Sequence, residues 1–196
     1  FKVGSHGATI GRGLIFDDDF SGLTATCKAG KNSYSIIWIK KDEQNHAYLK
    51  DVNEDGFLDT TNDAIVSDTE ADYFALTANM SLGNDISLSP FVLIDKTDGA
   101  LSTETARSIY YIGTDFDMKM GSTSMYATLA FKTGETETGS PAVTTDQEAY
   151  ALIAGVDTGM IHGKVMYATG DDTSTDENED FKGLSGQSHY WAEIMG

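Results

Sequence analysis

The chain has 196 residues, with 31 Asp or Glu against 13 Lys or Arg, and its formal net charge is -18. This acidity argues against nucleic-acid binding, because contacts to phosphate need clustered basic residues and only two arginines are present, Arg12 and Arg107. The single cysteine, Cys27, excludes an internal disulfide framework, and no stretch approaches the roughly 18 apolar residues of a transmembrane helix.

Alternation of apolar and polar residues with a period of two recurs from end to end, while helical periodicity is almost absent. The alternating segments are rich in Tyr, Ile, Val, Phe and Thr, which favour strands. The sequence therefore predicts an all-β fold. Ten strands are expected, at 1–12, 22–30, 33–43, 71–83, 86–96, 106–120, 123–134, 147–157, 161–170 and 187–196.

The connections between these strands alternate between two kinds. Tight Gly-containing turns are predicted at 29–32 (AGKN), 82–85 (LGND), 120–124 (MGSTS) and 157–160 (DTGM). Long acidic loops are predicted at 13–21, 44–70, 97–105, 135–146 and 171–186. This alternation is typical of an antiparallel up-and-down transmembrane β-barrel, with residues 1–196 as one barrel domain or part of one, whereas a Greek-key sandwich breaks it.

The two faces of the predicted strands differ in polarity. One parity is apolar and uncharged, as in Leu76, Val92, Ile112, Leu129 and Leu152. The opposite parity carries hydroxyl, amide and charged side chains. Lipid outside and water inside a barrel would give this division, and a soluble sandwich with one dry face would give it too.

The position of the aromatic residues favours the barrel. Rings with an apolar body and a polar tip settle at a membrane interface and form a girdle there. The apolar parity carries such rings at about one height near the long-loop ends. The predicted girdle is Phe74, Tyr110, Phe131, Tyr150, Tyr167 and Tyr190.

Charged residues on the polar parity are the candidates for a pore lining. Fixed charges of both signs along a narrow lumen bias ion selectivity. Solvation or weak cross-strand pairing would explain the same residues without a pore. The predicted lining is Lys28, Asp115, Asp117, Lys119, Lys132, Asp157, His162, Lys164 and Glu193, with Lys2, His6 and Arg12 less securely placed.

Three stretches, GRGLIFDDDFSGLTATC, AYALIAGVDTGMIHGKVMYATGDD and SHYWAEIMG, resemble strand and loop segments of bacterial outer-membrane porins, especially those with alginate-export-like strand motifs. The resemblance covers essentially the whole chain and implies a water-filled channel, commonly in a homotrimer. The sequence ends at Met195 and Gly196 without the usual closing aromatic residue, so we expect an internal portion of a longer barrel or an incomplete chain. The arginine ladder of general porins is absent, which argues against their constriction mechanism.

A calcium-loop pattern lies in the longest predicted loop, in DVNEDGFLDTTND. Alternate oxygen ligands and a central glycine are what such a loop needs, with a backbone carbonyl at its seventh position. Asn62 stands where a bidentate Glu is usual, which would weaken binding, and a solvated acidic loop explains the pattern equally. The candidate ligands are Asp51, Asn53, Asp55, Phe57, Asp59 and Asp63.

The sequence favours an outer-membrane porin of a Gram-negative bacterium, passing small hydrophilic solutes or ions by diffusion. The acidic loops predict a mild cation preference. No cofactor is required beyond possible Ca²⁺, and the expected partners are outer-membrane lipid, lipopolysaccharide and further copies of the chain. Catalysis is not expected, because the four histidines are dispersed. The alternatives are a soluble extracellular calcium-binding β-sandwich, for adhesion or carbohydrate binding, and a barrel that anchors without conducting.

Overall fold

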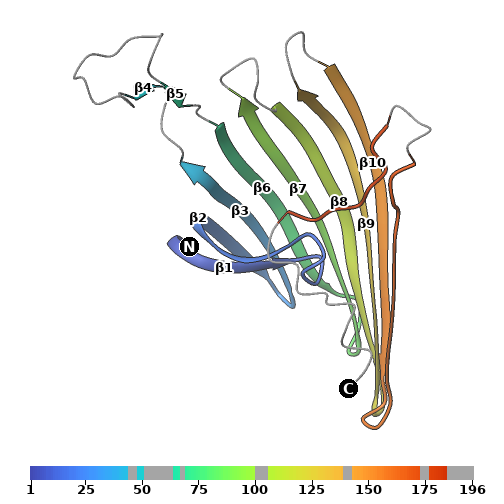
Figure 1. The fold of residues 1–196 in the computed structure, drawn as a ribbon. Coiled ribbons are helices and arrows are strands. Elements are labelled where there is room, and N and C mark those ends of the chain that lie inside the picture. The colour runs from blue at the N-terminus through green and yellow to red at the C-terminus, as the bar shows by residue number, and fades with distance from the viewer. Residues whose placement is uncertain are drawn as a thin grey trace.

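A computed structural model of the chain contains strands and irregular segments but no helix among the residues it describes, so the predicted all-β class is confirmed (Figure 1). The structure describes residues 1–43, 48–50, 64–66, 69–99, 106–138, 143–172 and 177–184. Its strands are β1 (Lys2–Ile10), β2 (Phe16–Ala29), β3 (Asn32–Glu43), β4 (Tyr48–Lys50), β5 (Ala64–Val66), β6 (Thr69–Ser81), β7 (Ile86–Gly99), β8 (Ala106–Met120), β9 (Thr123–Thr138), β10 (Val143–Asp157) and β11 (His162–Ala168).

Nine of these strands form one antiparallel sheet in the order β1-β2-β3-β6-β7-β8-β9-β10-β11, and β4 pairs with β5 in a separate hairpin. Sheet neighbours follow one another along the chain once that hairpin is set aside, so the predicted up-and-down meander is confirmed. The sheet is open between β1 and β11 and is compatible with a barrel wall. The expected tenth strand at 187–196 lies outside the described residues.

The four predicted tight turns lie where the sequence placed them, and each joins two paired strands. Gly30 and Gly121 adopt φ values of 64° and 62° in two of these turns, a left-handed conformation that glycine adopts without steric cost.

Four of the predicted long loops are shorter than expected. Residues 16–21 of the expected 13–21 loop belong to β2, and the 97–105 loop loses its first residues to β7. The predicted 135–146 loop is also too long, because β9 runs to Thr138 and β10 starts at Val143. Thr and Glu alternate there without an apolar face, so the sequence carries no strand signal although the backbones pair. In the 44–70 connection, β4 and β5 form a hairpin and β6 already starts at Thr69.

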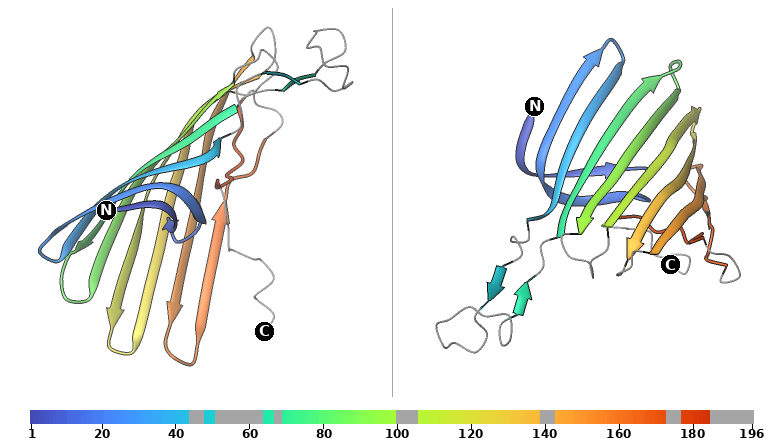
Figure 2. Two further views of the ribbon diagram at one scale, coloured as in Figure 1. Left: turned by 90° about the vertical axis from the view of Figure 1, so that its left-hand side faces the viewer. Right: turned by 90° about the horizontal axis from the view of Figure 1, so that it is seen from above.

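The first hairpin bends away from the other strands and runs across one face of the sheet (Figures 1 and 2). Residues 16–20 of β2 pair only with β1, whereas residues 25–29 pair only with β3. Gly22 lies where the two ladders overlap, and a Cβ atom built on it would come 2.0 Å from the Trp38 carbonyl oxygen. We call the face covered by this hairpin the inner face and the opposite one the outer face.

Pro90 lies inside β7 without shifting the register. A proline removes one ladder hydrogen bond, and the sequence predicts a local bulge there. The register with β6 is instead the same on both sides, with Thr77 opposite Phe91 and Met80 opposite Leu88. The Asn79 amide donates a hydrogen bond of 3.1 Å to the Ser89 hydroxyl across the interrupted ladder.

Substituting Gly22 with alanine should destabilise the fold, because the added methyl group would overlap the Trp38 carbonyl at the bend. We expect a loss of about 2 to 4 kcal/mol in the free energy of unfolding, measured by urea denaturation in detergent. Gly163→Ala is the matched control, since its Cβ would lie at an ordinary 3.4 Å from Val156. Equal stability of the two variants would contradict the assigned role of Gly22.

Candidate functional site

The outer face is a continuous apolar surface that no other part of the described chain covers. Leu76 is 56 % exposed and Phe131 is 50 % exposed, although both lie within well-paired strands. The even-numbered side chains of β3, β6, β7, β8 and β10, with the odd-numbered ones of β9 and β11, make up this face. Other exposed members are Tyr34, Ile36, Leu82, Ile112, Met120, Leu129, Leu152 and Val165.

An aromatic row crosses the outer face toward the ends of the strands away from the tight turns. We define this aromatic row as Trp38, Phe74, Tyr110, Phe131, Tyr150 and Tyr167, all of them exposed. Trp38 pairs with Phe74, and Phe131 pairs with Tyr150, whose ring centroid is 5.7 Å from that of Tyr167. Along the sheet the row steps toward the tight turns, because Phe131 lies two residues nearer to them than Thr133, the register partner of Tyr110, and Tyr167 pairs with Leu152 rather than Tyr150.

Charged and polar side chains begin on the outer face directly beyond the aromatic row. Register partners cross six strands there as one line: Lys40, Asp72, Lys96, Ser108, Glu135 and Asp146. Lys40 Nζ lies 3.8 Å from Asp72 Oδ1, which also accepts a 3.3 Å hydrogen bond from the Trp38 indole. The indole therefore keeps its apolar body in the uncharged band and its polar edge at the charged border.

The uncharged band has the height of a membrane core. From Tyr110 to Met120, β8 rises about 33 Å at roughly 3.3 Å per residue. At a strand tilt of about 40° this spans about 25 Å, the usual height of the apolar band of an outer-membrane barrel. Three methionines, Met118, Met120 and Met125, lie beside Phe116 on the tight-turn side of the outer face.

The inner face divides into a polar half near the tight turns and a dry half farther along. The register puts Lys28, Asp115, Asp117, Lys119, Asp157, His162 and Lys164 on the inner side of the polar half. Lys119, Ser124, Asp157 and His162 are successive register partners, and Asp157 Oδ2 lies 3.1 Å from His162 Nδ1. Most residues of the predicted pore lining thus share one face and one half of the sheet.

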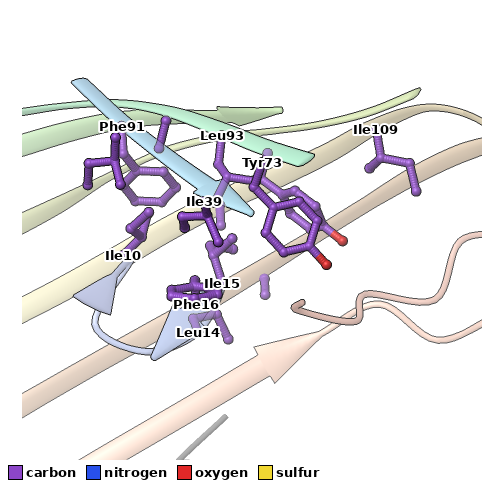
Figure 3. Packing of buried hydrophobic residues seen from close by; sticks show 14 of the residues in the cluster. Ile10, Leu14, Ile15, Phe16, Ile39, Tyr73, Phe91, Leu93 and Ile109 are labelled. Carbon is purple, nitrogen blue, oxygen red and sulfur yellow. The ribbon is translucent and has the colours of Figure 1, made fainter. Parts of the chain in front are cut away.

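The dry half is filled by turn 11–15, the connection between β1 and β2. Ile10, Leu14, Ile15 and Phe16 pack against inner-face side chains such as Ile39, Tyr73 and Leu93, and all are buried (Figure 3). The chain reverses here through three left-handed residues, Gly11, Arg12 and Gly13. Burial of these side chains removes apolar surface from water and fixes the turn to the sheet.

Arg12 anchors the turn at the border of the two halves. Its guanidinium donates a 2.5 Å hydrogen bond to Asp117 Oδ1 and lies 4.7 Å from the ring centre of Tyr126. A charge-assisted bond and a cation–π contact on one side chain restrict its position more than either alone. The sequence singled out both charges, although nothing in it showed that they would meet across 105 residues.

A second segment crosses the inner face, residues 177–184, which we call the strap (Figure 1). Asn178 forms a parallel β-bridge with Gln147. Phe181 is buried, and its ring centroid lies 6.3 Å from that of Tyr111. The Leu184 amide donates a hydrogen bond of 2.8 Å to the Ile15 carbonyl. The Tyr111 hydroxyl donates to the Lys182 carbonyl over 2.8 Å. The strap thus touches β8, β10 and the turn.

Lys132 corrects the predicted pore lining. It lies on the inner face but is only 5 % exposed, because the strap covers it. Its ammonium donates to Gln147 Oε1 over 2.8 Å and to the Asp180 carbonyl over 3.0 Å. On the exposed side of the strap, the hydrogen bond from Lys182 to Asp180 raises the pKa of the Lys182 ammonium.

A buried polar cluster in the dry half was not foreseen. Asp95 is fully buried, accepts a 3.0 Å hydrogen bond from the Thr97 hydroxyl and lies 3.5 Å from Arg107 Nε. The Thr97 hydroxyl also accepts from that nitrogen over 3.2 Å. The inner parity of Asp95, Thr97 and Arg107 was the available signal, but parity alone does not indicate that Asp95 and Thr97 are buried.

Several predicted residues lie outside the part of the chain that the structure describes. They are the whole calcium set (Asp51, Asn53, Asp55, Phe57, Asp59 and Asp63), Glu193 of the pore lining and Tyr190 of the girdle. Within the described ranges, no three His, Cys, Asp or Glu side chains are grouped to hold a metal ion. Nor does any helix long and apolar enough to cross a membrane occur among the described residues.

Comparison of the chain with protein-family models, with curated proteins and with solved structures finds no match. The function must therefore be argued from the two faces of the sheet.

Neutralising Asp117 should loosen turn 11–15, because Arg12 would lose the ionic partner to which its guanidinium donates. We expect Asp117→Asn to speed trypsin cleavage after Arg12 several-fold in the folded, detergent-solubilised protein. Asp157→Asn, which removes an inner-face carboxylate paired with His162 instead, should leave that rate unchanged. The anchor would be disproved if both variants were cut at the wild-type rate.

Proposed function

We propose that the chain forms the wall of a porin-like β-barrel in an outer membrane, with its outer face in lipid and its inner face toward a restricted aqueous path. The observation that carries this proposal is the outer face: an uncovered apolar band, bordered by the aromatic row and then by charges. In water such a surface would expose far more contiguous apolar area than soluble monomers tolerate.

The sandwich alternative needs a second sheet against that apolar band. Among the described strands all but β4 and β5 belong to a single sheet, and the turn and the strap cover its other, inner face. The observed layering therefore supports a barrel wall better than a soluble sandwich.

The proposed path follows the inner face and is narrowed by the chain itself. Two polar hollows border the first hairpin. One is lined by Ser5, Asp18, Asp19, Ser21 and Lys40, and the other by side chains of the polar half such as Ser33 and Asp115. Because turn 11–15 and the strap pack on the dry half of the inner face, we expect slow passage of small solutes rather than the high conductance of a wide pore.

Arginine in the middle of the apolar band should impair membrane insertion. Ile112→Arg places a cation on the lipid-facing side at a cost of about 2 to 4 kcal/mol near the bilayer midplane. Glu135→Arg, on the same face beyond the aromatic row, is the control and should insert like the wild type. The readout is the folded fraction in liposomes, from the mobility difference between boiled and unboiled samples on a gel; equal insertion of both variants would contradict a lipid-facing band.

The excess of acidic residues should make the path cation-preferring. In planar bilayers with a KCl gradient, we expect small unitary currents whose reversal potential shows K⁺ passing more readily than Cl⁻, with the preference weakening at high salt. Anion preference would contradict the charge argument. A membrane-inserted protein that carries no current would leave the barrel as an anchor and overturn the channel.

A further inference from the structure

The hollow on the tight-turn side of turn 11–15 has a distinct chemical lining. Its volume is about 230 Å³, and residues 9–11 of the first hairpin form one wall. The opposite wall is a row of inner-face side chains on four adjacent strands, Ser33, Asn79, Ser89 and Asp115. Ser33 and Asn79 are register partners, as are Ser89 and Asp115, so these groups lie at one level of the sheet.

The next level of the sheet adds two hydroxyls and an apolar surface. Ser35 pairs with Thr77, and Thr77 pairs with Phe91, whose ring is buried beside Pro90 and Ile37. Gly113, opposite Phe91, leaves room for that ring, since a Cβ atom there would come 2.5 Å from it. The hollow thus combines hydroxyls, one amide and one carboxylate with an aromatic wall.

From this lining we infer that the hollow binds one small neutral polyhydroxylated solute, such as a monosaccharide. Among the described residues that line the hollow none is Lys, Arg or His, and the Asp115 carboxylate disfavours an anionic solute. Hydroxyl, amide and carboxylate oxygens match the alternating donors and acceptors of a sugar, and its C–H faces suit the Phe91 ring. At about 30 Å³ per water, the hollow has room for roughly seven or eight waters, the scale of one sugar ring with its nearest waters.

Several of these polar groups are held in place before any solute arrives. Asn79 donates to Ser89 over 3.1 Å, and Asp115 Oδ1 accepts from the Thr128 hydroxyl over 2.6 Å. Fixing the groups in advance lowers the ordering cost of binding. The inference names the solute class for the proposed path, and it relies on the proposed function only for how the solute reaches the hollow.

The test is saturation-transfer NMR and titration calorimetry of the full chain in detergent, with glucose as the probe. We expect saturable binding with a dissociation constant on the order of 1 to 10 mM. Asn79→Ala and Ser89→Ala should each weaken binding about tenfold, because each removes a hydrogen-bonding group. Ser87→Ala is the matched control, two residues along β7 on the same face but outside the hollow, and should bind like the wild type.

Circular dichroism and the boiled-versus-unboiled gel shift identify variants that misfold, and Asp115→Asn, of nearly unchanged shape, provides a second comparison that should also weaken binding. Absence of glucose binding at about 100 mM, equal binding by Ser87→Ala and Ser89→Ala, or binding of K⁺ without glucose would each overturn the inference. Glucose binding by a chain that carries no current would overturn the channel and keep the site. Current without glucose binding would overturn the sugar site and keep the channel.

Discussion

The structure depends on one constraint, the solvent that meets the outer face of the sheet. The strands keep their polar backbone groups paired, so what distinguishes the two faces is their side chains. On the outer face an uncharged band ends at the aromatic row, and charge begins at the next level, with Lys40 and Asp72 beside Trp38. Such an abrupt change across several strands is what a boundary between hydrocarbon and water imposes.

The inner face differs from the outer face because other segments of the same chain cover part of it. Turn 11–15 packs its apolar side chains over the dry half, and the strap covers Lys132, which keeps hydrogen-bonding partners there. The half near the tight turns keeps exposed polar side chains. In a barrel with such a wall, turn 11–15 and the strap would narrow the path. The residues that fix these two segments to the sheet, Arg12 and Phe181 above all, would therefore set the width of the path.

Much of the sheet could be predicted from the sequence, because alternation and turn residues are local signals. The strand order, the four tight turns and the parity of each face follow from them. The polar ends of β9 and β10 could not be predicted, since alternating Thr and Glu present no apolar face. The sequence predicts a strand to residue 12 and a long loop at 13–21, whereas the chain reverses at Gly11, Arg12 and Gly13 and residues 16–21 already pair with β1. The run of acidic residues Asp17, Asp18 and Asp19 hides this strand, because it interrupts the apolar alternation.

The sequence predicted on which face of the sheet the candidate residues lie, but not which of them would contact one another. Residue parity placed Asp115, Asp117 and Lys119 on the inner side, and the register agrees. The Arg12–Asp117 pair and the burial of Lys132 arise from segments separated by tens of residues in the chain, so no local pattern encodes them. The predicted girdle does not include Trp38, although Trp38 has the same parity as the neighbouring outer-face residues Tyr34 and Ile36.

The most direct test of the lipid-facing assignment uses Trp38 as a depth probe. In a Trp191→Phe background, Trp38 is the only tryptophan, and its fluorescence can be followed in liposomes made with lipids brominated at chosen depths. The account predicts strong quenching that is greatest for bromines near the headgroup end of the acyl chains. Fluorescence that brominated lipids leave unchanged, but that a water-soluble quencher such as iodide removes, would contradict it.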